Sequence, residues 1–164
     1  MLNARLTVAI ASALLIGHDA CSADTRTQPD SRHDPNMRPL AAQGHAMRAR
    51  LTINNRALSA TLIDSETTRD FISLLPLTLT MKDLFGREKF AHLPRALAEG
   101  GKRVRTYEVG DVIYWSPGPD LAIYYRHDSQ SIPSPGIIVL GKLDVGAEVL
   151  DVPGTVKATI EFMK

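Results

Sequence analysis

The sequence predicts a mainly β domain, a barrel or sandwich of about seven or eight strands with one or two short helices. Three observations support this class. Apolar and polar residues alternate in several short runs, and turn-forming residues separate these runs at short intervals. Only one segment places its apolar residues at the spacing of a helix.

The composition narrows the range of functions. The chain has 164 residues, of which 44% are hydrophobic and 23% are charged, and its formal net charge is +1. These values are typical of one globular domain, and so balanced a charge provides no field that attracts nucleic acid or an anionic membrane. Cys21 is the sole cysteine, which excludes an internal disulfide framework and any multi-cysteine metal site. We expect no cofactor.

Residues 1–23 have the pattern of a secretory signal peptide. Arg5 precedes an apolar stretch, Leu6–Gly17, and small residues follow at Ala20 and Ala23. The apolar stretch is too short to cross a bilayer as a helix. We therefore expect export to the periplasm or the medium.

Two alternatives to soluble export remain. Cys21 fits a lipid anchor only in part, because His18 and Asp19 depart from the usual lipoprotein signal. If translation starts at Met47 instead, the protein stays in the cytoplasm. Residues 24–46 contain prolines and many polar residues, so we predict a flexible linker there and a domain over residues 47–164.

The first half of the domain begins with a predicted hairpin. Arg48–Ile53 alternates as a strand, Asn54-Asn55 suits a tight turn, and residues 56–63 return as the second strand. Asp64 or Ser65 is placed to cap a short helix that ends at Pro76. The residues of this helix predicted to face the core are Thr68, Phe71, Ile72 and Leu75.

The second half of the domain continues the strand pattern. A long polar connection is predicted over residues 95–109. The predicted strands cover residues 77–82, 88–93, 111–115, 121–125, 137–140 and 156–162. Five residues, 116–120, join the strands at 111–115 and 121–125, so these two strands are expected to form an antiparallel hairpin.

The order of short motifs resembles the small bacterial cyclophilin-like domain family, whose members form a cyclophilin-type barrel without the cyclophilin signature. The resemblance covers nearly all of residues 47–151 and implies a closed β-barrel. It departs at Ser65, at Gly118-Pro119 and in the loop of residues 127–135, which belong to loops around the barrel mouth. The motifs that carry the resemblance are Leu62–Asp64, Phe71–Thr78, Glu88-Lys89, Leu93-Pro94, Gly110–Trp115, Pro117, Leu121–Tyr125, Gly136–Ile138 and Leu140–Lys142.

No catalytic residue carries over from the true cyclophilins. They are similar to one another in an arginine near a phenylalanine and a histidine, followed by a glutamine before paired glycines. Here Gly100-Gly101 is the only glycine pair, and a glutamate precedes it. The sequence also lacks a nucleophile elbow, a metal-ligand spacing and a phosphate-binding loop. We assign no catalytic and no metal-binding residue.

Two pairs of aromatic neighbours indicate a binding surface. Adjacent residues of a strand face opposite sides, so only one member of Tyr114-Trp115 and one of Tyr124-Tyr125 belongs to the core. We predict that Ile113, Trp115, Ile123 and Tyr125 point into the barrel. Tyr114 and Tyr124 then stand outside as a contact pair, although Val112 and Ala122 suit a core equally well. The candidate binding residues are Tyr114, Tyr124, Glu88 and Arg126.

These features favour an exported, non-enzymatic module that binds a small molecule or peptide, with no nucleic-acid partner and no membrane span. One alternative is a divergent peptidyl-prolyl isomerase. Another is an accessory domain that binds no small ligand.

Overall fold

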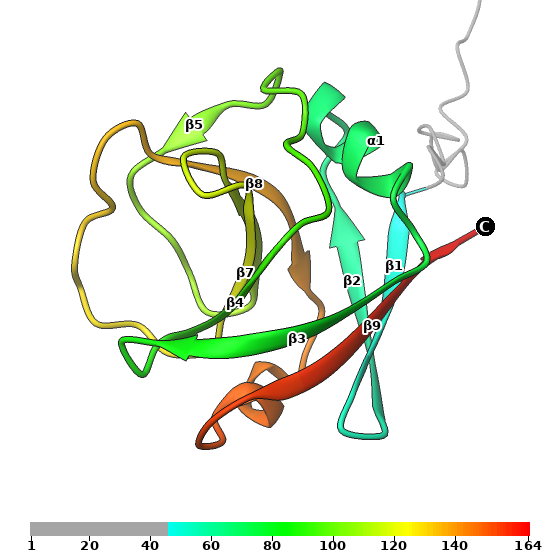
Figure 1. Ribbon diagram of the computed structural model, residues 1–164, viewed down its shortest axis with the longest axis vertical. Helices are drawn as coiled ribbons and strands as arrows, with labels where there is room; N and C mark the ends of the chain where they lie inside the picture. Colours follow the sequence, from blue (N-terminus) through cyan, green and yellow to red (C-terminus); the bar gives the residue numbers. More distant parts are fainter. Residues whose placement is uncertain (1–45) are drawn as a thin grey trace, which may run out of the picture. The chain divides into compact units, whose positions relative to one another are not determined.

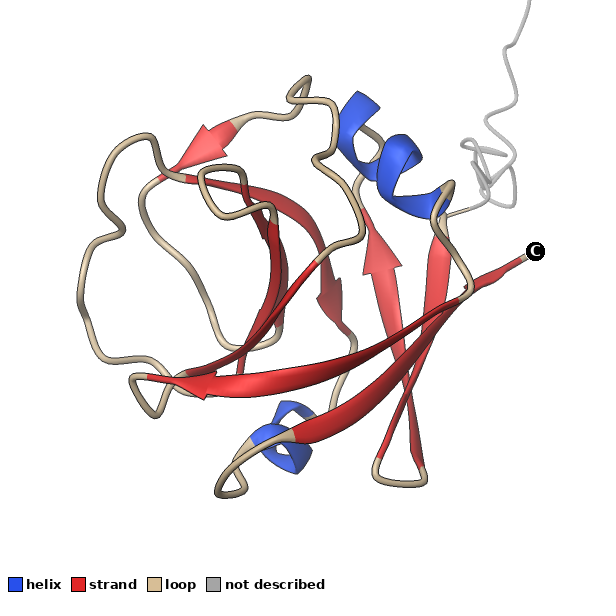
Figure 2. Cartoon of the chain, viewed as in Figure 1, coloured by secondary structure: helices blue, strands red, loops and turns tan. Residues whose placement is uncertain are grey.

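The computed structural model describes residues 46–164. The predicted signal peptide, Cys21 and all but the last residue of the predicted linker lie outside the described residues. The described part holds nine strands, one α-helix and one 3-10 helix (Figures 1 and 2). The strands are β1 (Arg48–Ile53), β2 (Arg56–Leu62), β3 (Leu77–Leu84), β4 (Glu88–His92), β5 (Arg103–Val104), β6 (Asp111–Trp115), β7 (Asp120–Tyr124), β8 (Ile137–Leu143) and β9 (Val156–Met163).

Eight of these strands close into an antiparallel barrel. They follow the order β2-β1-β9-β3-β4-β7-β6-β8, and β8 pairs back with β2 through Ala60↔Leu143 and Leu62↔Gly141. The ninth strand, β5, adds to β8 at its first residues. The predicted class, a mainly β closed barrel, is therefore confirmed. The strand β5 falls in the connection that the sequence pattern predicted to be irregular.

The local structure of the first elements follows from their residues. Asn54 and Asn55 have φ angles of 48° and 66°, as a two-residue hairpin turn between β1 and β2 requires. Ser65 precedes α1 (Glu66–Ile72), and its Oγ accepts a hydrogen bond of 3.1 Å from the Thr68 amide. Phe71, on the inward side of this helix, is 1% exposed and joins the barrel core.

The helical segments lie at opposite ends of the barrel as drawn in Figure 2: α1 at one end, and η1 (Ala147–Leu150) at the other. Both contribute apolar side chains to the interior, through Phe71 and Leu150. The core thus extends from one capped end of the barrel to the other.

A polar cluster joins β4 to the loop before β9. Lys89 is fully buried, and its Nζ donates to Asp83 Oδ2 (2.8 Å), to the Val152 carbonyl (2.6 Å) and to the Gly154 carbonyl (2.9 Å). The hydroxyl of Tyr125 donates to the same Asp83 oxygen at 2.6 Å. All three donors of the ammonium group are used, so the burial of Lys89 is fully compensated by hydrogen bonds.

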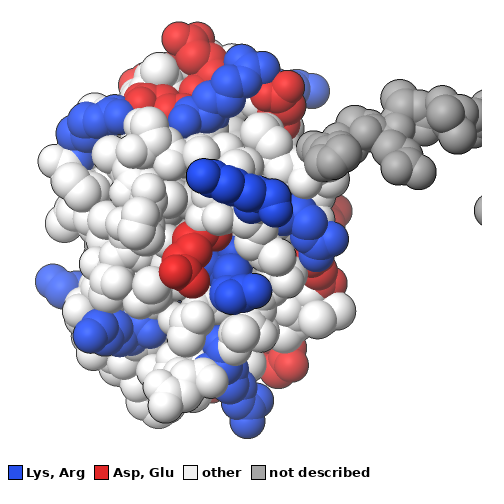
Figure 3. Space-filling view, turned by 90° about the vertical axis from the view of Figure 1, so that its right-hand side faces the viewer, with Lys and Arg blue, Asp and Glu red and all other residues white. Residues whose placement is uncertain are grey.

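The surface carries charges of both signs. On the face shown in Figure 3, lysine and arginine side chains lie among aspartates and glutamates, with uncharged areas between them. Several of the charges form ion pairs, for example Arg48 with Asp144 and Arg95 with Asp70. Within residues 46–164, no helix is long and apolar enough to cross a membrane.

Candidate functional site

A pocket lies on the outer face of the sheet, where β4, β7 and β6 run side by side. The strand register arranges their outward side chains in rows across the three strands. The middle row is Phe90, Ala122 and Ile113, and the next row is His92, Asp120 and Trp115. At the other end, Glu88 of β4 is paired with Tyr124 of β7. Because Ala122 is the smallest residue of these rows, it leaves a hollow between its larger neighbours.

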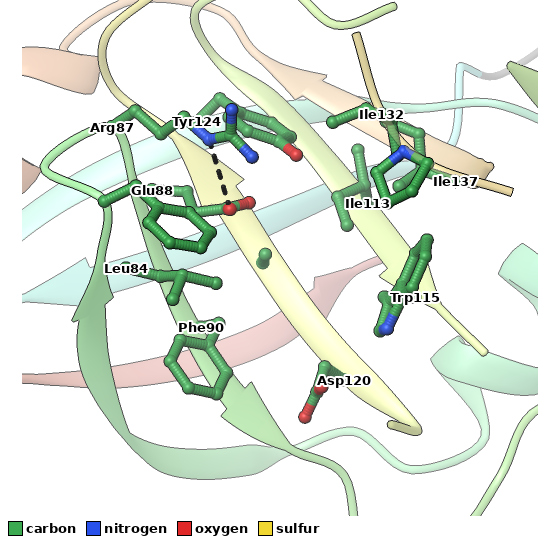
Figure 4. A pocket seen from close by; sticks show the side chains of 13 residues that line it. Leu84, Arg87, Glu88, Phe90, Ile113, Trp115, Asp120, Tyr124, Ile132 and Ile137 are labelled. Carbon is green, nitrogen blue, oxygen red and sulfur yellow. Dashed lines mark hydrogen bonds and ion pairs between the residues drawn. The ribbon is translucent and has the colours of Figure 1, made fainter. Parts of the chain in front are cut away.

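The pocket encloses about 260 Å³ and is mostly apolar. In Figure 4, Leu84 and Phe90 form one wall, while Trp115 and Ile137 form the opposite one. Arg87, Glu88 and Tyr124 gather at one end, and Asp120 lies at the other. Such a concave, apolar cavity with a few polar groups is the usual form of a small-ligand site.

A second apolar cluster, outside the barrel, supports the end of the pocket near Tyr124. The rings of Tyr107 and Tyr124 stack with centroids 3.8 Å apart, and His127 lies over Tyr107 at 4.9 Å. Ile132 from the following loop completes the cover. As a result Tyr124 is only 2% exposed although it points away from the barrel interior.

Arg87 links this end of the pocket to the covering loop. Its Nη1 donates to Asp128 at 2.9 Å, and its Nε lies 3.4 Å from Glu88 Oε1. Asp128 also accepts hydrogen bonds from the Tyr107 hydroxyl and from the Gln130 amide. The Tyr107 hydroxyl, followed by these other donors, lowers the pKa of Asp128 to about 2, so this carboxylate stays charged and holds Arg87 in place.

Glu88 is the buried acid of the pocket. It is 5% exposed, and burial raises the pKa of its carboxyl, while hydrogen bonding by Tyr124 and the charge of Arg87 oppose that shift. Among the arginines of residues 46–164, only Arg87 donates to Glu88, and its Nε lies 3.4 Å from Oε1, a long distance for a hydrogen bond. The carboxyl of Glu88 therefore keeps acceptor capacity within the pocket.

Asp120 is the second acid and sits at the opposite end. Its Oδ1 is buried and has no hydrogen-bond partner among residues 46–164. The Nδ1 atom of His92 lies 2.5 Å from this oxygen and 3.0 Å from the Gly118 carbonyl, but it meets hydrogen-bond geometry only at the carbonyl. Burial raises the pKa of Asp120, and the nearby His92 opposes the shift.

An aromatic side chain stands at the rim. Phe85 and Gly86 form the turn between β3 and β4 with φ angles of 56° and 64°. A bulky residue is uncommon in this left-handed region. Phe85 is nevertheless 76% exposed, lines the pocket and lies 5.2 Å from the guanidinium of Arg87.

The predicted orientation of Tyr114 is wrong. Its side chain is fully buried in the barrel core, where its hydroxyl accepts a hydrogen bond of 3.1 Å from the Leu97 amide. Ile113 and Trp115, which were expected inside, face the outer pocket, and Trp115 is half-buried. The hairpin explains the error: Trp115 pairs with Asp120, so the link is one residue shorter than predicted, and a one-residue change in register reverses the faces.

The other predicted binding residues lie in different places. Tyr124 faces outward as expected and lines the pocket beside Glu88, but the stacked Tyr107 separates it from solvent. Ile123 and Tyr125 point into the barrel as predicted. Arg126 is exposed, pairs with Asp151 at 2.7 Å and does not line the pocket.

Several pocket residues were missed by the sequence analysis: Phe85, Arg87, Phe90, Trp115 and Asp120. A period-two signal was present for some of them, since Glu88, Phe90 and His92 alternate with Lys89 and Ala91 along β4. No pattern could reveal that the turn at Phe85 and the distant loop at Asp128 meet at Arg87. In the described part of the chain, no cluster of three His, Cys, Asp or Glu residues is arranged to hold a metal ion.

Comparisons with known proteins agree with the barrel fold. The model of the Cyclophilin-like family matches residues 51–161. The solution structure of a hypothetical protein from Archaeoglobus fulgidus superposes with a TM-score of 0.57 at 22% sequence identity, covering 74% of this chain and 98% of that one. That likeness supports the fold alone. No curated protein sequence matches this chain.

Proposed function

Because the chain belongs to the Cyclophilin-like family, we propose that its barrel serves as a scaffold for binding, with the outer-face pocket as the site. The ligand is a small apolar molecule or an apolar side chain of a peptide. The observation that carries the proposal is the hollow above Ala122, which aromatic and aliphatic side chains surround on the sheet and in the covering loop.

The same pocket argues against prolyl isomerisation. That reaction benefits from an arginine free to donate to the twisted amide. Among residues 46–164, Arg87 is the only arginine lining the pocket, and its guanidinium already faces Glu88 and Asp128 while stacking near Phe85. We therefore propose a binding module without isomerase activity.

A pocket-filling variant tests the binding function. Trp115 lines the pocket and is the sole tryptophan, so its indole N–H gives one signal in a ¹H–¹⁵N spectrum of the full chain. We expect a neutral probe, 2-phenylethanol, to shift this signal. Ala122→Leu should abolish the shift because the new side chain occupies the hollow. The control Ala57→Leu adds the same group at an exposed position of β2 and should leave the shift intact.

An equal response of Trp115 in both variants would locate the probe elsewhere and refute the proposed site. Mass spectrometry of a ligand that co-purifies from the native host would identify its natural occupant. Isomerase assays on a proline-containing peptide should show no catalysis. Catalysis that Ala122→Leu removes would support the enzymatic alternative instead.

We also propose that the domain acts outside the cytoplasm, on the basis of the signal-peptide pattern of residues 1–23. A ligand-binding domain without a predicted enzymatic site fits a role in capture or transport of a molecule in that compartment.

A further inference from the structure

We propose that the pocket selects ligands that carry a positively charged nitrogen on an apolar body, with Glu88 as the counter-charge. This inference rests on the proposed binding function and specifies its ligand class. It follows from three properties of the pocket: its charges, its unsatisfied acceptors and its aromatic groups.

The charges around the pocket favour a cation. In the described part of the chain, its lining includes two acids, Glu88 and Asp120, one arginine, Arg87, and no lysine. Arg87 is committed to Asp128 at 2.9 Å on the far side of its guanidinium. With Glu88, Asp120, Asp128 and Arg87 charged, three carboxylates lie near one guanidinium, and His92 Nδ1 lies 2.5 Å from Asp120 Oδ1. Even with a positive charge on His92, the balance is one net negative charge at a site with apolar walls. Charges interact more strongly there than in bulk water.

The two acids also retain unused acceptors. The side chain of Glu88 is 6% exposed, and its neighbouring donors are Tyr124 and Arg87 Nε, the latter at 3.4 Å. A carboxylate accepts up to about four hydrogen bonds, so two donors leave acceptor capacity for a ligand. The buried Oδ1 of Asp120 lies 2.5 Å from His92 Nδ1 without hydrogen-bond geometry, and no other donor among residues 46–164 reaches it. A buried acceptor without a donor is unfavourable, and an ammonium group supplies three donors together with the matching charge.

Aromatic rings complete the site for a cation. The side chains of Phe85, Phe90, Trp115 and Tyr124 all line the pocket, and the faces of such rings attract cations. One guanidinium already uses this property, since Arg87 lies 5.2 Å from the Phe85 ring and 5.8 Å from the Tyr124 ring. The same rings repel an anion, so charge and aromatic surface select in the same direction.

The backbone at the rim points to a ligand contact as well. The hairpin turn at Phe85 and Gly86 suits Asn-Gly, yet an exposed phenylalanine occupies its first left-handed position. Strained positions of this kind are concentrated at functional sites. Here the turn places an aromatic ring at the entrance, 5.2 Å from the guanidinium of Arg87.

Three probes of nearly equal size separate the ligand classes: 2-phenylethylamine, 2-phenylethanol and phenylacetate. Each is titrated into the full chain at neutral pH and followed through the indole signal of Trp115. We expect the amine to bind roughly tenfold more tightly than the alcohol, as one net charge-assisted contact provides. Phenylacetate should bind more weakly than the alcohol.

Glu88→Gln removes the charge and preserves the shape, so it should reduce the amine's preference over the alcohol to near unity. Glu161→Gln changes the net charge equally at an exposed position of β9 and should leave the preference unchanged. Should Glu88→Gln fail to fold, the order of the three probes on the unaltered chain still decides the matter.

The outcomes separate this inference from the proposed function. If the alcohol binds in a manner that Ala122→Leu abolishes, but the amine is no tighter, the cation selectivity is wrong and the binding site stands. Tighter binding of phenylacetate would mean that a protonated Glu88 donates to anions, which overturns the inference. If none of the probes shifts Trp115, both the inference and the proposed function fail.

Discussion

The buried ammonium group of Lys89 gives the sharpest test of how the barrel is held together near the loop before β9. The perturbation is Lys89→Met, which preserves the length of the apolar stem and removes the charge. Because the stem remains, little new cavity forms, and the effect isolates the three hydrogen bonds of Nζ to Asp83, Val152 and Gly154.

The magnitude follows from what these partners lose. Breaking a buried ion pair costs about 3–5 kcal/mol when the remaining charge is left without compensation. Asp83 is not in that position: its side chain is 30% exposed and keeps the Tyr125 hydroxyl and the Gly86 amide. The carbonyls of Val152 and Gly154 lose charged donors. We therefore expect the free energy of unfolding to fall by about 3 kcal/mol, the low end of that range.

The assay is equilibrium unfolding in urea, followed by the fluorescence of Trp115. Lys157→Met is the matched control on the exposed face of β9 and should change the free energy of unfolding by less than about 0.5 kcal/mol. In a double-mutant cycle with Asp83→Asn, the coupling energy should be about 1–2 kcal/mol. A loss below about 1 kcal/mol in Lys89→Met would refute the idea that this cluster fastens the loop to β4.

Four further predictions follow from the structure and the sequence. In carboxyl-detected NMR, Glu88 should titrate above the ordinary value of 4.5 and Asp128 near 2. Folding lowers the pKa of Asp128, so the contribution of Asp128 to the free energy of unfolding is present above pH 3.8 and is lost as the pH falls toward 2. Folding raises the pKa of Glu88, so the contribution of Glu88 is lost as the pH rises through its folded pKa. The reverse order of the two titrations in the spectrum would contradict the assigned contacts. Phe71→Ala should lower the free energy of unfolding by about 3–5 kcal/mol, because Phe71 is 1% exposed, and a change under about 1 kcal/mol would exclude a core role. Phe85→Asn should leave stability equal or higher, because asparagine suits the left-handed turn, while weakening the binding of 2-phenylethylamine; unchanged binding would remove Phe85 from the site. N-terminal sequencing of protein from the native host should find a start between Cys21 and Asp24, and a start at Met1 or Met47 in the cytoplasm would refute export.

The sequence was most informative where one residue decides a local conformation. The asparagine pair at residues 54–55 predicted the first hairpin, and Ser65 was one of two residues predicted to cap the helix, because turn and cap chemistry depend on neighbours in the chain. Alternation along residues 156–162 predicted β9, because successive side chains of a strand point to opposite faces of the sheet.

The candidate site was less accessible to such reasoning, because it depends on register and on contacts between distant segments. A single residue in the β6–β7 link placed Tyr114 in the core and Trp115 in the pocket. Arg87 and Asp128 are 41 positions apart, and nothing in either local sequence indicates that they meet. Glu88 was identified, but the local sequence does not indicate that it lines one pocket with the distant Ile132.

The strict alternation along β4 and β7 has an evolutionary consequence. Residues 88, 90, 92, 120, 122 and 124 face outward, while Lys89, Ala91, Leu121 and Ile123 between them face the interior. Mutations at the outward positions can change what the domain recognises while the hydrophobic interior stays as it is. The same arrangement makes the protein sensitive to insertions, because adding or deleting one residue in the β6–β7 link would exchange the two sets of side chains on one strand. Drift in ligand preference is therefore expected to proceed by substitution, and length changes are expected to be confined to the outer loops.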